Sequence, residues 1–482
     1  MLVDFKLLFF VKGFANFPIL RSKNKQQKGR YIMGIISRHT TFDELLRAGM
    51  EISGNGTAVF YEENGQKKSM SYQELLDAIN QVKVPDGSSI GILCDGGLST
   101  VLNIFAAAKA EKQIVILEPS VPEKALQMLI RATDCDALMG EDKDSPALQA
   151  ALGSGVATPS HSILYFTSGT TSMNKAVELT ESSFCASAYN GSSCDPLHPG
   201  DILLGLLPYS HVYGFVCCLL WAWECGAAVA LGRGRRHFVD DCAFYQPTAL
   251  TVVPALVGFL FQHKLLNPEL KQILIGAGGC PPQLMQAIKG MGIDVSFGYG
   301  LTETSSGVAI STGNPDPSQM TICPDFTVNL ADDGEILIHS DYCMMKGYYK
   351  NPEATAEVLI DGWLHTGDLG KFDDAGKLHI IGRKKEVLVL SSGTKIFLPE
   401  YEMQLSAALG EQDLCVMLDS HERVIAVISS EDKKPTDYQE ALNAFNSTWE
   451  RSEQITRIEV RRDPLPRTAT GKLKRWMIVS AS

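Results

Sequence analysis

ILYFTSGTTSMNKAVELT, residues 163–180, is the stretch that says most about the fold of this chain. It begins with a short apolar run typical of a buried strand. Six small residues follow at positions 167–172, five of them carrying a hydroxyl group, and Lys175 stands just beyond. Small residues let backbone N–H groups approach an anion, hydroxyl groups add donors, and a lysine adds a positive charge. The stretch predicts a strand ending in a polyphosphate-binding loop, although composition alone also suits a surface Ser/Thr loop.

The same stretch resembles the TSG(S/T)TGxPK signature of the adenylate-forming superfamily. That superfamily comprises acyl- and aryl-CoA synthetases, luciferases and the adenylation domains of peptide synthetases. Ser172 stands where the family usually has glycine and Asn174 where it usually has proline, so the geometry of the loop is in question. The resemblance implies ATP binding by Thr167, Ser168, Gly169, Thr170, Thr171 and Lys175.

Length and composition describe an ordinary globular enzyme of several structural units. The chain has 482 residues, too many for one core, with 45% hydrophobic and 20% charged residues. A net charge of −12 argues against a general binder of nucleic acid or anionic membrane. Twelve cysteines without a CxxC pair indicate a reduced, cytoplasmic protein without a spaced metal site. No apolar run reaches the roughly 18 residues of a membrane span.

The chain before the loop is expected to form an α/β unit. Residues 1–32 are apolar and then basic, and we expect a poorly ordered extension, since a signal peptide would need a clearer cleavage pattern. Between residues 58 and 140, short apolar runs alternate with helical patterns. Ser71 and Glu74 form a predicted capping box at one helix start. This alternation predicts a largely parallel sheet that includes the strand at 57–60.

Two segments after the loop match family motifs around the acid substrate. LPYSHVYGF, residues 207–215, resembles the LPxxHxxG segment, which places His211, Tyr213 and Gly214 beside the carboxylate. A lone histidine among apolar residues is otherwise more often a packed structural one. AGGCPP, residues 277–282, resembles a GGAP-like turn, which places Gly279 and Cys280 beside the adenine and the acyl pocket. No sequence neighbour of Cys280 would lower the pKa of its thiol, so we expect a pocket-lining residue.

FGYGLTE, residues 297–303, is the most specific match and resembles the YGxTE motif. The resemblance implies that Tyr299 stacks on adenine, Thr302 donates to a phosphate, and Glu303 holds Mg²⁺ together with Thr170. Phe297, Gly298 and Gly300 would complete this ATP-binding strand end, with Gly300 also facing the acid.

The last third of the chain changes its periodicity. Residues 334–383 alternate with period two between turn signals, which predicts a small antiparallel, barrel-like sheet. HTGD, residues 365–368, resembles the family's TGD motif, whose aspartate, Asp368 here, accepts both ribose hydroxyls. In GRKK, residues 382–385, the resemblance makes Arg383 a ribose donor and Lys385 a hinge. PRTATGKLKR, residues 466–475, resembles the motif that carries the catalytic lysine, Lys472.

These observations predict an α/β protein. A large ATP- and acid-binding domain, residues 33–383, would contain two doubly wound subdomains and the small sheet. A small, mobile α+β domain, residues 384–482, would follow the hinge. The implied activity is an ATP- and Mg²⁺-dependent ligase that joins a fatty or aryl acid to CoA, with Lys472, Thr170, Glu303 and His211 as catalytic residues. The alternatives are an adenylating enzyme that loads the phosphopantetheine arm of a carrier protein, and a non-catalytic nucleotide-binding relative.

Overall fold

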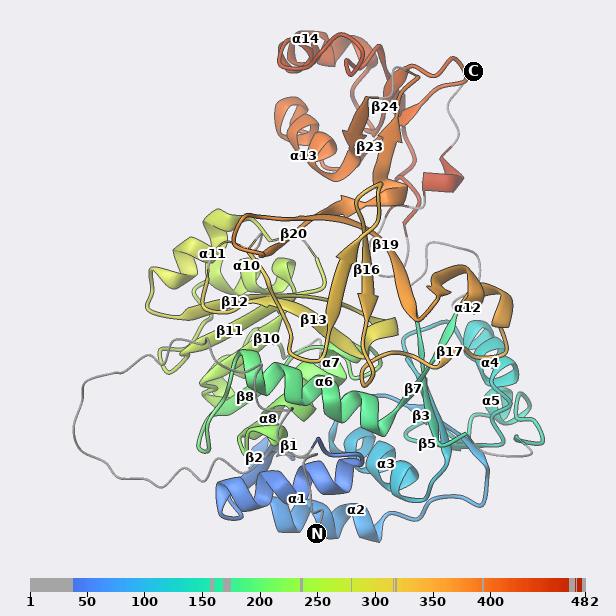
Figure 1. Cartoon of the computed structure of the whole chain (residues 1–482), viewed down its shortest axis with the longest axis vertical. Coiled ribbons are helices and arrows are strands. Elements are labelled where there is room, and N and C mark those ends of the chain that lie inside the picture. The colour runs from blue at the N-terminus through green and yellow to red at the C-terminus, as the bar shows by residue number, and fades with distance from the viewer. Residues whose placement is uncertain are drawn as a thin grey trace, which may run out of the picture. The chain divides into compact units, whose positions relative to one another are not determined.

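A computed structural model describes residues 38–156, 160–167, 175–234, 237–278, 280–314, 316, 319–391, 394–467, 473 and 475–478. The expected extension at residues 1–32 lies outside this range, as do Ser168–Asn174 of the phosphate loop, Gly279 and Lys472. The described chain alternates strands and helices around two large sheets (Figure 1). The predicted α/β class is confirmed.

The larger sheet has nine strands, six of which form its parallel centre. In spatial order these are β14 (Thr321–Ile322), β13 (Ser306–Ser311), β12 (Asp294–Leu301), β11 (Gln272–Gly276), β10 (Ala249–Val252), β8 (Ile202–Gly205), β9 (Ala228–Leu231), β1 (Thr57–Glu63) and β2 (Gln66–Ser71). The strands from β12 to β1 run parallel, and β2, β13 and β14 are antiparallel to their neighbours. Buried central strands of this kind are almost entirely apolar, as the fully buried β9 and β10 show.

The second sheet carries the loop region. Its order is β17 (Gly347–Tyr348), β7 (Ala176–Thr180), β6 (Ser162–Phe166), β4 (Gln113–Leu117), β3 (Ser89–Leu93) and β5 (Ala137–Met139). The strand expected at 57–60 was assigned to the wrong sheet, because β1 pairs with β9 of the nine-stranded sheet. Sequence order alone suggested that neighbouring strands share a sheet, but the β1–β2 hairpin finds its parallel partner about 170 residues later in the chain.

The expected antiparallel sheet contains β15 (Thr327–Leu330), β16 (Glu335–His339), β18 (Leu359–Ile360), β19 (Trp363–Phe372) and β20 (Leu378–Arg383). Further on lie the pair β21 (Val387–Val389) and β22 (Lys395–Phe397), and the three-stranded sheet of β23 (Leu414–Leu418), β24 (Val424–Ser429) and β25 (Arg457–Arg461).

Helices cover these sheets. They are α1 (Phe42–Ser53), α2 (Tyr72–Gln81), α3 (Leu98–Lys109), α4 (Glu123–Ala132), α5 (Pro146–Gln149), α6 (Glu181–Cys194), α7 (Val212–Phe215), α8 (Trp221–Glu224), α9 (Asp241–Tyr245), α10 (Pro254–Gln262), α11 (Pro282–Lys289), α12 (Pro352–Val358), α13 (Leu398–Leu409) and α14 (Gln439–Asn446). A π-helical turn, η1 (Val216–Leu220), joins α7 to α8, and short 3₁₀ turns are η2 (Thr302–Thr304), η3 (Lys384–Glu386), η4 (Pro435–Tyr438) and η5 (Arg475–Met477). The predicted capping box at Ser71 and Glu74 opens α2.

The main core joins residues of both large sheets. Phe42 of α1 stacks on Phe105 of α3 with ring centroids 4.7 Å apart, and Phe105 meets Trp223 of α8 edge to face. A separate apolar cluster holds only residues from Leu390 to Ile458. In the described residues, no helix is both long and apolar enough to cross a membrane.

Candidate active site

The phosphate loop connects the two strands of a hairpin. β6 and β7 pair in antiparallel register from Ser162–Thr180 to Phe166–Ala176, and the N–H of Thr167 donates to the carbonyl of Lys175 at 3.0 Å. The loop therefore leaves and re-enters the sheet at neighbouring points. Its residues Ser168, Gly169, Thr170 and Thr171 lie outside the described part of the chain, so their predicted ATP contacts stay predictions.

Lys175 and Glu303 both contact the side chain of Tyr348. The Nζ of Lys175 lies 4.4 Å from the centroid of the Tyr348 ring, a cation–π contact, and the Oη of Tyr348 donates to Oε1 of Glu303 at 2.8 Å. Burial and the neighbouring Glu303 carboxylate raise the pKa of Tyr348, so the phenol keeps its proton and donates at neutral pH. A carboxylate such as that of Glu303 is the kind of ligand that a hard cation such as Mg²⁺ prefers.

The three predicted adenosine-binding side chains converge. The Oη of Tyr299 donates to Oδ2 of Asp368 at 2.7 Å, and the Nε of Arg383 lies 3.0 Å from Oδ1. Asp368 and Arg383 are register partners on β19 and β20, whereas Tyr299 comes from β12 of another sheet. Asp368 is 3% exposed, and burial together with this carboxylate raises the pKa of Tyr299. A buried carboxylate held from two sides presents a fixed acceptor.

The strand end that leads to Glu303 needs a glycine at position 300. A Cβ on Gly300 would overlap the backbone carbonyl of Ser306, because the chain turns back through Ser305 and Ser306 with φ angles of 55° and 128°. At Gly298, two residues earlier, an added Cβ would meet a methyl of Leu274 at 3.7 Å, an ordinary van der Waals contact. The other predicted residues of this segment, Phe297 and Thr302, lie on β12 and at the start of η2.

The predicted acid-pocket residues start a helix beside β10 and β11. His211 is exposed and caps α7, where its carbonyl accepts from the N–H of Phe215 at 2.9 Å. The Oη of Tyr213 lies 3.1 Å from the carbonyl of Val252 and 3.3 Å from that of Leu274. The tyrosine hydroxyl is thus occupied by backbone, and its ring forms a wall against Gly276, where an added Cβ would lie 2.9 Å from it.

Of the remaining predicted site residues, the structure describes Cys280, Lys385 and Gly214 but not Lys472. Cys280 is buried, and burial raises the pKa of its thiol to about 11, which agrees with a pocket-lining role. Lys385 is exposed in η3. Gly214 packs its Cα against the carbonyl of Pro208. Lys472 is outside the described residues, and the flanking residues Arg467 and Leu473 form an antiparallel bridge.

Sequence reasoning missed two residues that organise this region. Nothing in the sequence spacing of Tyr348 indicated its bond to Glu303. The Nζ of Lys346 donates to the hydroxyl of Ser162 at 2.9 Å and lies 3.6 Å from Glu178, which ties β17 to the loop hairpin. A tyrosine and a lysine in the short run KGYYK were the available signal.

Comparisons with known proteins show what this chain is similar to. Residues 156–349 match the family of AMP-binding enzymes. The long-chain-fatty-acid–CoA ligase of Bacillus subtilis (strain 168) is 30% identical over 66% of this chain and 61% of its own length. The 2-succinylbenzoate–CoA ligase of Bacillus cytotoxicus is 31% identical over 50% and 53%. The chain spans about three fifths of the length of the curated long-chain relatives that it matches.

Solved structures share the fold. The O-succinylbenzoate CoA synthetase of Bacillus subtilis in complex with AMP superposes with a TM-score of 0.78 at 19% identity, covering 91% of this chain and 98% of that one. The anthranilate CoA ligase AuaEII in complex with anthranoyl-AMP gives 0.76 at 19% identity, covering 92% and 97%. Residues 156–349 of this chain are thus similar to the AMP-binding enzyme family, and the chain shares the fold of these two CoA ligases.

Proposed function

We propose that this protein is an ATP-dependent carboxylic acid–CoA ligase that forms an acyl-adenylate and then an acyl thioester. The observation that carries the proposal is the Tyr299–Asp368–Arg383 cluster. Tyr299 and Arg383, 84 positions apart, are joined through the one buried carboxylate of Asp368, and Tyr299 stands four residues before Glu303. The buried acceptor Asp368 suits the ribose of a nucleoside, and the Glu303 carboxylate suits the Mg²⁺ that accompanies its phosphates.

The first step joins the acid to the nucleotide. A carboxylate oxygen of the substrate attacks the α-phosphorus of ATP, the bond to the bridging oxygen breaks, and pyrophosphate leaves. Attacker and target are both anionic, so neutralising charge is the main task. Lys175 and Lys472 supply positive charge, and the loop residues 167–171 supply donors. Mg²⁺, held by Glu303 and Thr170, would add to this neutralisation when bound.

The second step releases the acyl group. The thiolate sulfur of CoA attacks the acyl carbonyl, AMP leaves with the electron pair of the broken C–O bond, and the thiol proton passes to solvent. Rotation of residues 384–482 about Lys385 would remove Lys472 from the pocket and admit the thiol. His211 and the Tyr213 ring would contact the acid, with Gly214, Gly279 and Gly300 leaving it room.

The proposal also covers the class of acid substrate, the cellular location and the acceptor thiol. The names of the relatives include both long-chain fatty acids and an aryl acid, so the substrate is proposed as a fatty or aryl carboxylate. A cytoplasmic role in fatty acid metabolism agrees with the fatty-acid relatives. A carrier-protein phosphopantetheine is the alternative thiol.

Carboxylate-dependent ATP–pyrophosphate exchange tests the adenylation step. Short, medium, long and aryl acids are compared for the native chain, Lys472→Ala and the matched control Lys474→Ala. We expect exchange with one acid class, a roughly 10²–10³-fold loss in Lys472→Ala and little change in the control. Thioester formation is then assayed with free CoA and with a phosphopantetheinylated carrier. Tight ATP binding without exchange for any acid would contradict the ligase and favour the non-catalytic relative.

A further inference from the structure

A pocket of about 310 Å³ lies at the opposite end of the large sheet from the candidate active site. It is formed where β8, β10, β11 and β12 begin, at Ile202, Ala249, Gln272 and Asp294. Ligand sites of open α/β sheets lie at the carboxyl ends of the strands, where Tyr299 and Glu303 are found. This pocket is therefore separate from the proposed chemistry, and its volume is at the lower end of the range for small-molecule sites, roughly 300–1,000 Å³.

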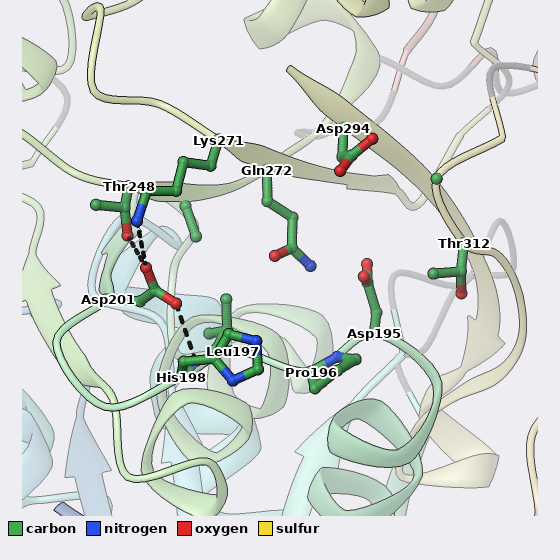
Figure 2. A pocket seen from close by; sticks show the side chains of 12 residues that line it. Asp195, Pro196, Leu197, His198, Asp201, Thr248, Lys271, Gln272, Asp294 and Thr312 are labelled. Carbon is green, nitrogen blue, oxygen red and sulfur yellow. Dashed lines mark hydrogen bonds and ion pairs between the residues drawn. The ribbon is translucent and has the colours of Figure 1, made fainter. Parts of the chain in front are cut away.

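One of its three carboxylates is already satisfied within the protein. Oδ1 of Asp201 accepts from Nζ of Lys271 at 3.2 Å and from Oγ1 of Thr248 at 2.9 Å, and Oδ2 accepts from the N–H of His198 at 2.9 Å (Figure 2). The charge of Lys271, the one lysine that lines the pocket, is thus engaged by Asp201. Asp195 and Asp294 are the other two acidic residues of the lining.

Two buried polar atoms of this pocket make no hydrogen bond of normal length and angle within the protein. They are Oδ2 of Asp195, a residue that is 7% exposed, and Nε2 of Gln272. Figure 2 shows both side chains directed into the same space, with Asp294 and Thr312 across from Asp195. A buried acceptor and a buried donor left unpaired are each unfavourable by roughly 1–3 kcal/mol, more for a charged group. A ligand that satisfied both atoms would remove that penalty.

The surroundings of Asp195 favour a cation. Asp195 follows the last residue of α6, a 14-residue helix whose C-terminal carbonyls carry partial negative charge. Burial raises the pKa of Asp195, and Asp294 acts in the same direction, while Ser296 and Gln272 lower it without offsetting these effects. A cation beside Asp195 would reverse the desolvation penalty on its carboxylate. In the ranges that the structure describes, no group of three His, Cys, Asp or Glu side chains is arranged to hold a metal ion.

We infer that this pocket binds a small organic ammonium cation that also carries a hydroxyl group, an amino alcohol by chemical class. Its ammonium donates to Oδ2 of Asp195 and faces Asp294, and its hydroxyl oxygen accepts from Nε2 of Gln272. Each of the two unpaired atoms thereby gains a partner of the matching kind. The binding is independent of ATP and of the proposed ligase activity.

Isothermal titration of the full chain with 3-amino-1-propanol at constant ionic strength tests the site. 1,3-Propanediol, which lacks the charge, and tetramethylammonium, which lacks N–H donors, are the matched ligand controls. We expect saturable binding of the amino alcohol at about one site per chain, and binding at least about tenfold weaker for both controls.

The variants separate the pocket from the general acidity of the protein. Asp195→Asn should weaken binding at least about tenfold and Asp294→Asn several-fold, while Asp332→Asn, at an exposed position elsewhere, should bind as the native chain does. Thermal unfolding confirms that each variant folds, and Asp294→Asn keeps the test valid if Asp195→Asn does not. Binding that is absent, equal for tetramethylammonium, or unchanged in both pocket variants would overturn the inference.

Discussion

The phenol of Tyr348 donates to the Glu303 carboxylate at 2.8 Å, and the Nζ of Lys175 makes a cation–π contact with one face of the same ring. Tyr348 is therefore a positioning residue for both the predicted metal carboxylate and the base of the phosphate loop. Tyr348→Phe keeps the ring and removes one hydrogen bond to a charged group, worth roughly 1.5–3 kcal/mol. We expect about a tenfold higher Mg²⁺ concentration for half-maximal exchange.

A second readout distinguishes positioning from a general loss of structure. Mg²⁺-dependent binding of a fluorescent ATP analogue should weaken in parallel in Tyr348→Phe, while metal-free binding stays near that of the native chain. Tyr342→Phe, at a tyrosine that is 47% exposed, is the control. An unchanged Mg²⁺ requirement in Tyr348→Phe would contradict the positioning role.

Asp368→Asn should act on nucleotide binding. The amide keeps the shape of the side chain but loses the charge that Arg383 and Tyr299 both contact. The proposed contact of Asp368 with the ribose would be made alike in the ground and transition states, so we expect KM for ATP to rise about 10–100-fold with a smaller change in kcat. Steady-state kinetics at varied ATP measures this, and a selective fall in kcat would instead indicate a role in the chemical step.

Gly300→Ala and Gly298→Ala form a matched pair. The added methyl at position 300 meets the backbone carbonyl of Ser306, whereas at position 298 its nearest neighbour is a methyl of Leu274 at 3.7 Å. Overpacking against backbone costs about 1–3 kcal/mol. We expect a lowered melting temperature and loss of exchange for Gly300→Ala only, measured by thermal unfolding. Equal behaviour of the two variants would contradict the contact.

Glu224 makes stability depend on pH. Burial raises the pKa of this carboxyl to about 8 from 4.5, Oε2 has no hydrogen-bond partner, and His39 lies 3.8 Å away with a pKa that burial lowers. Because the Glu224 carboxyl binds its proton more tightly in the folded state, it stabilises the folded protein fully at pH values below its unfolded-state pKa. Its contribution is lost as the pH rises from about 4.5 to about 8.

Glu224→Gln should therefore be more stable than the native chain at pH 8.5, by on the order of 2 kcal/mol, with little difference at pH 5. Denaturant unfolding at both pH values measures this. Glu63→Gln, at an exposed position of β1, controls for net charge. A stability difference that does not change with pH would argue against a neutral Glu224 in the native protein.

The sequence predicted the α/β class, the antiparallel sheet and the segments of the site because these depend on local periodicity and short motifs. The meeting of Tyr299, Asp368 and Arg383 came from a family resemblance, since no local pattern encodes contacts between different sheets. The placement of β1 was wrong because strand pairing over about 170 residues is settled by tertiary packing. Tyr348 and Asp195 were missed for a related reason, because an unpaired or bridging side chain is visible only in three dimensions.

The register of β19 and β20 determines which changes in chain length this protein should tolerate. Asp368 lies opposite Arg383, and the strands join through a tight turn where Asp373 accepts from the N–H groups of Ala375 and Lys377. Because successive residues of a strand face opposite sides, deleting one residue between Trp363 and Asp368 would turn the carboxylate away from Tyr299. Insertions at the turn leave the pairing of β19 with β20 unchanged, so Asp368 stays opposite Arg383. Length variation among natural homologues should therefore gather at residues 373–377 and be absent from the strand that precedes Asp368.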